Sequence, residues 1–375
     1  MSFSKRISIV VVNCFNSWIA EIKSKNVIFC CLFFIFIYGC VNKKESTDFL
    51  NAEIRTVESR RYDEELFISF CMDMAIVNSH FLITYDGAGR GALVARESDG
   101  NTIGPLGSRG QGPGEYITPS YAGKSINGDT IYLHDIAKQE MLIYKIDNFG
   151  DTLEWHYINK IERPQNNGFY DQIRRLKNGY YVGLRIEAEA KQQQILTLLD
   201  AQLNEVKTFA ASPITLERDY VDYKICYGNA RISVYENSVF FAVNSFGYIS
   251  GYDISDTGDI TTRFEEMLVE PSYQNSGRVV FNSENRRGFS DIAVSKNYIF
   301  ALYVGKAQDE LKPDGSGWAP ETFAVFNHDG KLISRIKLNN KAFRLTVSED
   351  EERLYFCSQN PEFVIEEYQL SDLIK

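Results

Sequence analysis

A short pattern of strands recurs six times along most of this 375-residue chain, and it limits the folds that the chain can adopt. Each repeat contains a strongly apolar second strand, at residues 80–86, 130–135, 180–184, 239–243, 298–303 and 354–357. An apolar third strand follows, at residues 92–95, 141–146, 195–199, 248–252, 323–326 and 363–368. Turns such as Asp99-Gly100 and Asp329-Gly330 come next, and their chemistry is typical of antiparallel neighbours.

Repeated all-β units of about 40 to 50 residues indicate a β-propeller, because one small sheet cannot bury both of its faces alone. Six units predict six blades. The last unit ends near Leu370 after three strands, whereas a lone strand at residues 52–57 precedes the first unit. We therefore expect an all-β, six-bladed β-propeller in which the N-terminal strand completes the last blade and closes the ring without a covalent bond.

Residues 107–116 read Gly-Ser-Arg-Gly-Gln-Gly-Pro-Gly-Glu-Tyr, which fits neither a helix nor the interior of a strand. Pro113 fixes its own φ angle and favours an extended Gly112, so this stretch should be an ordered connection between two sheet units. A phosphate-binding glycine loop is excluded, because such a loop opens directly into a helix and Pro119 follows closely here.

The N-terminal residues have the order of an export signal. Lysines precede an apolar run at residues 27–38, and Cys40 follows it. The run is shorter than the ~20 apolar residues that span a bilayer as a helix, so residues 1–39 are predicted to be a cleaved signal peptide. Residues 37–40 read Ile-Tyr-Gly-Cys and resemble a bacterial lipobox, in which the cysteine is acylated. A plain secretory signal and an uncleaved anchor are the alternatives.

We expect a tether at residues 40–50 and the propeller domain at residues 51–375. Cleavage before Cys40 removes four basic residues and one acidic residue, which changes the net charge from −10 to −13. This acidity disfavours nucleic acid and anionic lipid surfaces as partners of the folded part, so membrane contact should come from acyl chains on Cys40. The expected location is the bacterial cell envelope, at the outer membrane.

Three cysteines remain after the lipobox, at positions 71, 226 and 357. Their odd number and wide spacing argue against a disulfide framework and favour buried free thiols.

Together these features resemble the TolB-like six-bladed β-propeller lipoproteins of bacterial envelopes. The resemblance rests on the six units, on Gly-Gln-Gly-Pro-Gly-Glu-Tyr at residues 110–116 and on the lipobox, and it covers about residues 40–375. It implies a fold and a cellular location. It implies little chemistry, since the biochemical role of that group is mostly unassigned.

The lengths of the connections distinguish the two faces of such a propeller. Short turns join the first strand to the second and the third to the fourth, and we call the side that they share the short-turn face. The long connections emerge on the other side, the loop-rich face: the glycine crossover and residues 162–171, 213–229, 270–288 and 305–321. Binding residues concentrate on long ordered loops, so we expect a ligand to bind the loop-rich face around the mouth of the central channel.

The candidate ligand-binding residues are the aromatic and charged side chains of these connections. They are Arg109, Glu115, Tyr116, Tyr220, Tyr273, Arg286, Arg287 and Trp318, together with Tyr170, Arg218, Asp219, Tyr223 and Arg278. Aromatic rings and arginines of this kind suit sugar rings, peptides or another protein surface. The alternatives are that Arg109 and Glu115 pair across the crossover and that the tyrosines only pack within their loops.

Sequence support for catalysis is thin. The chain has no Gly-x-Ser-x-Gly, His-Glu-x-x-His or Cys-x-x-Cys motif, and its four histidines are scattered, so no catalytic residue, metal or cofactor is predicted. The sequence favours a non-catalytic module that binds a glycan, peptide or partner protein. The alternative is an envelope lyase or hydrolase, for which two or more carboxylates should converge in the channel mouth.

Overall fold

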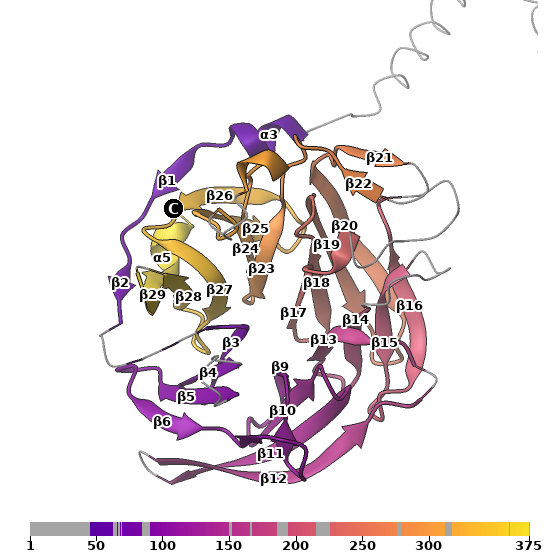
Figure 1. The fold of residues 1–375 in the computed structure, drawn as a ribbon, viewed down its shortest axis with the longest axis vertical. Coiled ribbons are helices and arrows are strands. Elements are labelled where there is room, and N and C mark those ends of the chain that lie inside the picture. Colours follow the sequence, from indigo (N-terminus) through magenta and orange to yellow (C-terminus); the bar gives the residue numbers. More distant parts are fainter. Residues whose placement is uncertain are drawn as a thin grey trace, which may run out of the picture. The chain divides into compact units, whose positions relative to one another are not determined.

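Most of the described strands form six small, mainly antiparallel sheets, which are arranged as blades around a central axis (Figure 1). The computed structural model describes residues 46–62, 66, 68, 70–84, 91–149, 152–165, 167–185, 194–214, 226–275, 279–311, 317–359 and 361–374. All of them belong to one compact unit that begins at Ser46. The predicted six-bladed β-propeller is confirmed, and a strand is found at each expected second and third position; residues 85–86 of the first expected second strand lie outside the described residues.

Four consecutive strands make each of the first four blades, and the first strand lies innermost (Figure 1). Blade one contains β3 (Asp73–Val77), β4 (His80–Thr84), β5 (Ala92–Arg96) and β6 (Thr102–Pro105). Blade two contains β9 (Pro119–Lys124), β10 (Thr130–Asp135), β11 (Glu140–Phe149) and β12 (Thr152–Glu162). Blade three contains β13 (Tyr170–Arg175), β14 (Tyr181–Arg185), β15 (Gln194–Leu199) and β16 (Glu205–Ala211). Blade four contains β17 (Arg231–Tyr235), β18 (Ser238–Ala242), β19 (Gly247–Ile254) and β20 (Ile260–Val269).

The last two blades receive strands from the N-terminal part of the chain. Blade five contains β23 (Phe289–Val294), β24 (Tyr298–Tyr303), β25 (Thr322–Asn327) and β26 (Leu332–Lys337), with β1 (Ile54–Thr56) added at its outer edge. Blade six contains β27 (Lys341–Val347), β28 (Arg353–Gln359), β29 (Phe363–Gln369) and the outer strand β2 (Arg60–Arg61), and the helix α5 (Leu370–Leu373) follows β29.

Short elements occur in the connections. They are the strand pairs β7 (Ser108–Arg109) with β8 (Glu115–Tyr116) and β21 (Tyr273–Asn275) with β22 (Val279–Phe281), and the 3-10 helix η1 (Gln308–Glu310).

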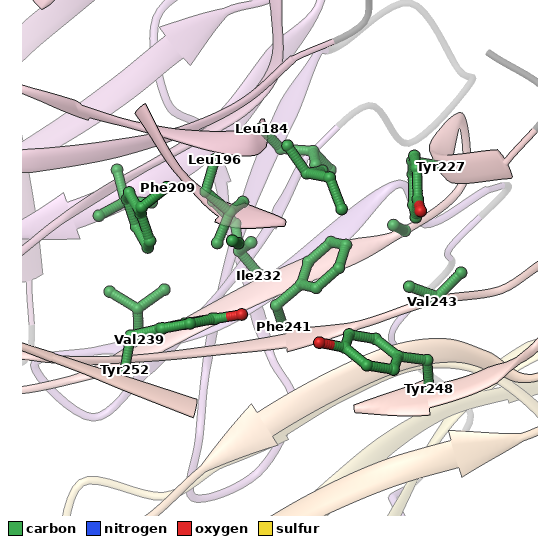
Figure 2. Close-up of a cluster of buried hydrophobic side chains, with 14 of the residues drawn as sticks. Leu184, Leu196, Phe209, Tyr227, Ile232, Val239, Phe241, Val243, Tyr248 and Tyr252 are labelled. Carbon is green, nitrogen blue, oxygen red and sulfur yellow. The ribbon is translucent and has the colours of Figure 1, made fainter. Parts of the chain in front are cut away.

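The core lies between the blades, as six clusters of buried side chains that each join two neighbouring sheets. Strand β24 shows why these strands are apolar on both faces. Its Ile299 packs between blades four and five, while the adjacent Phe300 packs between blades five and six. Figure 2 shows the cluster between blades three and four, where Leu184 and Leu196 lie near Phe241. A strand that is buried on both faces has no polar side to alternate with its apolar side.

The N-terminal segment closes the ring, as expected, but with different residues from those predicted. The lone strand expected at residues 52–57 does not complete the last blade: β1 pairs in parallel with β26 of blade five. The last blade is completed by β2 instead, which pairs antiparallel with β29. In Figure 1 the indigo segment follows the outer edge of both blades. One extended segment therefore bridges the last two blades, and its strands take the edges that are open.

Part of the expected tether is folded. Residues Ser46–Asn51 form the helix α3, and the Phe49 ring inserts between blades four and five, with its centroid 4.9 Å from that of Tyr303. Arg335 holds this segment by donating from Nη1 to the carbonyl oxygens of Phe49 and Leu50, at 3.0 and 3.1 Å. The ordered domain thus begins before residue 51. None of the helices in the described part of the chain has both the length and the apolar character that crossing a bilayer requires.

Candidate functional site

The innermost strands of all six blades surround a cavity of about 550 Å³ in the central channel. Its lining includes residues 73–76 of β3 and the later residues of the other inner strands, such as residues 121–124 of β9 and 232–235 of β17. The lining then continues into the turns that follow, at Ile126, Lys177 and Glu236. Because these turns join first strands to second strands, the cavity extends to the short-turn face. The expectation that the ligand site surrounds the channel mouth on the loop-rich face does not match the location of this cavity.

A salt bridge forms part of the inner end of the cavity. Asp73 Oδ2 lies 3.0 Å from Arg174 Nη2 and also accepts a hydrogen bond of 2.9 Å from the Ser120 hydroxyl. Arg174 Nη1 donates to the Tyr121 carbonyl oxygen at 2.6 Å. Both side chains of the bridge are largely withdrawn from solvent. Strands of blades one, two and three are therefore joined inside the channel by one charged network.

A second charged network joins the other blades. Asp291 Oδ2 accepts a hydrogen bond of 3.0 Å from the Leu345 amide, and Oδ1 lies 3.8 Å from Arg231 Nε. Arg344 donates through Nε to the Met72 carbonyl oxygen. Burial raises the pKa of Asp291, while the charges of Arg344 and Arg231 oppose that rise. Burial, with a smaller effect of Arg344, lowers the pKa of Arg231 to about 10, so this guanidinium remains charged at neutral pH.

We call these five side chains, Asp73, Arg174, Arg231, Asp291 and Arg344, the charged belt. A second, small cavity of about 10 Å³ lies beside Asp73, Arg174 and Arg231. Met72 and Asp171 also line it; they precede, along the chain, the residues that line the 550 Å³ cavity. That volume holds about one water molecule. The charged belt thus separates the 550 Å³ cavity from the loop-rich side of the channel. Sequence reasoning missed the belt, although a charged residue inside an otherwise apolar inner strand is a usable signal.

The charges at the outer end of the cavity are paired as well. Lys177 Nζ lies 2.7 Å from Glu236 Oε1, and Lys124 pairs with Glu349. Glu349 also accepts a hydrogen bond of 3.1 Å from the Asn78 amide. Among the described side chains here, Ile126 is an apolar exception that is 76 % exposed. The cavity therefore combines ion pairs with aliphatic and aromatic walls.

The glycine crossover on the loop-rich face is ordered, as predicted, and its candidate residues mostly shape it. Its two ends pair in parallel, with Arg109 opposite Tyr116. Glu115 turns back into the loop, where Oε2 accepts a hydrogen bond of 2.7 Å from the Gly112 amide. Tyr116 is fully buried and donates its hydroxyl to the Leu106 carbonyl oxygen. The prediction that Tyr116 binds a ligand is wrong, because its ring packs between blades one and two.

Asp135 explains why this crossover is rigid. The buried Asp135 carboxylate accepts hydrogen bonds from the amides of Ile117 and Thr118, at 2.7 and 3.0 Å. It also accepts one of 3.1 Å from the Ala137 amide in its own turn. The acidic side chain at the end of this second strand therefore accepts hydrogen bonds from backbone amides of the neighbouring connection.

Other candidates lie in loops or in the core. Tyr170 is buried, and its hydroxyl donates to Glu205 Oε1 at 2.5 Å. Tyr273 begins the β21–β22 pair, with its ring 6.4 Å from that of Phe281. The predicted Cys40 and the candidates Arg218, Asp219, Tyr220, Tyr223 and Arg278 lie outside the described residues.

Three of the predicted residues come together on the loop-rich face. The Arg287 guanidinium carbon lies 4.6 Å from the centroid of the Trp318 ring, and Trp318 is 38 % exposed. Arg286 donates from Nη1 to the Gly305 carbonyl oxygen at 2.8 Å and lies 3.9 Å from Glu310 Oε2. We call Arg286, Arg287 and Trp318 the Arg-Trp cluster.

Backbone hydrogen bonds fix the support of this cluster. The Arg287 amide donates to the Lys306 carbonyl oxygen at 2.9 Å, and the Gly305 amide donates to the Arg287 carbonyl oxygen at 3.1 Å. These bonds join the connection before blade five to the long insertion within blade five. Burial lowers the pKa of Arg287, which lies under the indole. The cluster is therefore a fixed aromatic and cationic surface.

The histidines do not gather into a site. His134 is fully buried, and neither ring nitrogen has a hydrogen-bond partner within the part of the chain that is described. His80 Nδ1 lies 2.6 Å from the Asn78 carbonyl oxygen. Over the described residues there is no group of three or more histidine, cysteine, aspartate or glutamate side chains that could hold a metal ion.

The family model described as TolB-like 6-blade propeller-like matches residues 48–350. The chain belongs to this TolB-like propeller family. Two solved structures show the same fold at low sequence identity. A protein of the DUF4221 family from Bacteroides vulgatus aligns with a TM-score of 0.55 and 13 % identity, over 84 % of this chain and 96 % of that one. A protein described as exported, from Bacteroides fragilis, aligns with a TM-score of 0.52 and 10 % identity, over 83 % and 93 %. No curated protein matches this TolB-like chain.

Proposed function

We propose that this TolB-like propeller is a non-catalytic binding module of the cell envelope, which engages a glycan, a peptide or a partner protein through its loop-rich face. The observation that carries the proposal is the Arg-Trp cluster, an exposed indole held against a guanidinium on a hydrogen-bonded support. Tryptophan and arginine are enriched among the residues that dominate binding energy at interfaces. Their fixed positions also reduce the entropy that binding would cost.

The form of the loop-rich face supports a large ligand. At the charged belt, the small cavity lined by Met72, Asp171 and Arg231 has about the volume of one water molecule, which is too small for a ligand. A glycan chain or a protein surface needs no deep pocket and can lie across several connections. Arg109 and Glu115 of the crossover, Tyr220, Tyr273 and the Arg-Trp cluster remain the proposed contacts on this face.

The proposed location is the outer membrane, through acyl chains on Cys40. The lipobox at residues 37–40 supports this anchor. The TolB-like family and the fold shared with a protein described as exported agree with export from the cytoplasm. A cleaved and acylated protein should have the mass of residues 40–375 plus its acyl groups. An intact mass beginning at Met1 would remove the anchor from the proposal.

Two carboxylates in the channel favour a second candidate, a hydrolase or lyase that acts in the 550 Å³ cavity. Asp73 and Asp291 both line this cavity, and burial raises the pKa of Asp291, as a general acid requires. Their contacts favour a structural role, however. Asp73 is bound to Arg174 and Ser120, and Asp291 is bound to the Leu345 amide. We therefore place the binding module first.

Binding to a glycan and peptide array tests the function and the face together. The Arg286→Ala/Trp318→Ala variant removes the exposed part of the Arg-Trp cluster. The matched control, Lys177→Ala/Glu236→Ala, removes an exposed ion pair at the outer end of the cavity on the opposite face. We expect the first variant to bind at least about tenfold more weakly than the unmodified protein, since hot-spot residues each contribute about 2 kcal/mol.

The outcomes separate the two faces. Weaker binding by the control alone would move the site to the cavity. Equal binding by all three proteins would remove both face assignments. Turnover of an array compound by the unmodified protein, lost in an Asp291→Asn variant, would replace the binding module with the second candidate.

A further inference from the structure

The innermost strand of each blade has one open edge. Strands β3, β9, β13, β17, β23 and β27 each lie at the end of their sheet and pair with a single neighbour, so their second edge faces the channel. An edge strand presents backbone N–H and C=O groups that its own sheet does not pair, and these groups need other partners. The partners differ along the channel.

At the level of the charged belt, side chains from neighbouring strands bind these edge groups. Asp291 Oδ2 accepts a hydrogen bond of 3.0 Å from the Leu345 amide of β27. Gln172 of β13 serves β17: its Oε1 accepts from the Ile232 amide at 3.2 Å, and its Nε2 donates to the Ala230 carbonyl oxygen at 2.8 Å. At this level the protein itself supplies the partners of the open edges.

One level nearer the short-turn face, the same edges continue without such partners. Backbone groups that point to one side recur at every second residue of an antiparallel strand. Because Ile232 and Leu345 direct their amides away from their own sheets, Val234 and Val347 direct their N–H and C=O groups towards the channel as well. Within the described residues, no side chain makes a hydrogen bond to the backbone of either valine.

This open level continues around the ring. In blade five the Ser295 amide donates to the Tyr298 carbonyl oxygen of its own sheet at 2.9 Å, so the preceding Val294 faces the channel. Equivalent bonds follow the inner strands of blades two, three and six. The corresponding residues, which we call the edge ring, all line the 550 Å³ cavity: Ile76, Lys124, Arg175, Val234, Val294 and Val347. Among them the Lys124 carbonyl oxygen has a partner, Arg175 Nη1 at 3.4 Å.

The charges around the cavity nearly balance. Four basic and five acidic side chains line it, and Arg231 of the charged belt lies beside them. A ligand with a net charge would therefore compete with existing ion pairs or stay unpaired in a partly enclosed site, and both are costly. An apolar ligand would displace water from the edge ring and leave its N–H and C=O groups without hydrogen bonds. The cavity suits a neutral molecule that carries many hydrogen-bonding groups.

We propose that the 550 Å³ cavity binds a small neutral saccharide or a related polyol, whose hydroxyl groups bond to the edge ring. A hydroxyl group both donates and accepts, which suits a wall that offers N–H and C=O groups side by side. The volume lies within the range of small-ligand pockets. This site lies on the face opposite the Arg-Trp cluster, and it is a binding activity beyond the function proposed above.

An extended peptide fits the same edges less well. A peptide that adds a strand to a sheet pairs with several successive residues of one edge. In β17 and β27 the edge position beside the edge ring is already taken, by Gln172 at Ile232 and by Asp291 at Leu345. Each of these strands therefore offers an isolated donor and acceptor, and a compact ligand can reach such groups on several blades at once.

Calorimetric titration of the purified protein tests the ligand class. The neutral probes are D-glucose, D-galactose, maltose and myo-inositol, and the comparison compounds are glucuronate, glucosamine and cyclohexanol. We expect at least one neutral probe to bind with a Kd of about 1 mM or lower, as a ligand of this size can. Its charged or apolar counterparts should bind at least about tenfold more weakly. No binding by any neutral probe, or equal binding by the comparison compounds, would overturn the proposal.

Proline substitutions test the site. Val234→Pro, Val294→Pro and Val347→Pro each remove an edge N–H that makes no bond within its sheet, and the matched alanine variants shorten the same side chain but keep the N–H. We expect at least one proline variant to bind the saccharide about threefold to tenfold more weakly than its alanine counterpart. The Arg286→Ala/Trp318→Ala variant should bind it as the unmodified protein does. Binding lost in that variant and kept in all proline variants would move the saccharide to the loop-rich face, which would overturn the cavity site and support the proposed function.

Amide hydrogen exchange of the unmodified protein gives a second measurement, which does not depend on whether a proline variant folds. Edge-ring amides contact water in the open cavity, so a bound saccharide should slow their exchange. We expect slower exchange in peptides that contain residues 232–235, 292–294 and 345–347, and unchanged exchange at β21 and β22. Unchanged exchange in all three inner-strand peptides at a saturating saccharide concentration would overturn the site.

Discussion

The two faces of this TolB-like propeller hold their polar groups in different ways. On the loop-rich face, Tyr116 of the glycine crossover is buried, and so is Asp135 at the end of β10, whose carboxylate binds the backbone that follows the crossover. On the short-turn face the turns are too short to cover the axis, and the cavity of about 550 Å³ extends to them. The charged belt lies between these two regions. Long loops do not by themselves create a pocket, because ordered loops also fill space.

This difference separates two kinds of binding. The loop-rich face offers the Arg-Trp cluster, in which Trp318 is 38 % exposed. The short-turn face offers enclosure, in a volume typical of small-ligand pockets. A ligand class found by experiment therefore indicates a face, and a variant on one face should leave the other unaffected. The two faces bind independently only if the charged belt is a fixed boundary between them.

Replacing Asp73 with alanine tests that boundary and should have the largest effect on stability. The Asp73→Ala change leaves Arg174 and Ser120 without their carboxylate partner inside the channel. We expect a loss of about 2–4 kcal/mol in the free energy of unfolding, measured in urea, since a mostly buried charge loses its counter-ion. The control is Lys177→Ala, in an exposed pair, which should cost less than about 0.5 kcal/mol. Equal losses in the free energy of unfolding would mean that the charged belt stabilises the protein no more than an exposed ion pair does.

Replacing one glycine on each face with alanine compares how tightly the two faces are packed. These changes should have the next largest effect on stability. Gly114, in the crossover on the loop-rich face, has φ +71°, and an added Cβ would lie 2.7 Å from the Tyr157 ring. Gly179, in a turn on the short-turn face, has φ +93° and no atom within 4 Å of such a Cβ. We expect Gly114→Ala to cost about 2–3 kcal/mol and Gly179→Ala about 1 kcal/mol, because both strain the backbone but only one also clashes.

Thermal denaturation of the two glycine variants measures this difference. The Tyr144 hydroxyl, which donates to the Gly114 carbonyl oxygen at 2.6 Å, links the crossover to blade two and leaves the added methyl group little room to move. Similar losses in both variants would show that the glycine crossover is no more tightly packed than a surface turn.

The sequence was sufficient for the parts of the fold that repeat. Second and third strands are buried on both faces, so runs such as residues 298–303 are continuously apolar and can be recognised alone. The sequence predicted that an N-terminal strand closes the ring, but not which residues pair with which blade. The reason is that β1 and β2 are short and pair with sheet edges instead of packing in a core. Phe49 was missed because one aromatic residue beside a tether carries no periodic signal.

The candidate site was less predictable, for a physical reason. Whether a loop side chain faces solvent depends on contacts with distant segments, and no local pattern records them. Tyr116 is buried by packing between two blades, whereas Trp318 is exposed and meets Arg287 from another connection. The charged belt is formed by residues up to 271 positions apart, such as Asp73 and Arg344, and becomes visible only when the ring is closed.

The acid response of the protein tests the buried core beside Arg174 of the charged belt, at His134. Burial, with a smaller effect of the Arg174 charge, lowers the pKa of His134 from its usual 6.5 to about 3. Below pH 6.5 the unfolded chain binds a proton that the folded protein does not, so stability decreases as the pH falls towards 3. His134 should contribute up to about 1.4 kcal/mol of lost stability per pH unit within this window.

In a His134→Phe variant the decrease in stability between pH 6 and pH 4 should therefore be shallower than in the unmodified protein, as measured by urea denaturation at each pH. The control is His156→Phe, which makes the same chemical change at a side chain that is 61 % exposed and leaves the core untouched. If the His134→Phe protein retains the full acid slope, water or protons reach His134 beside Arg174 in the folded protein. The loop-rich side of the channel would then be open to small ligands, and the distinction between the two faces would weaken.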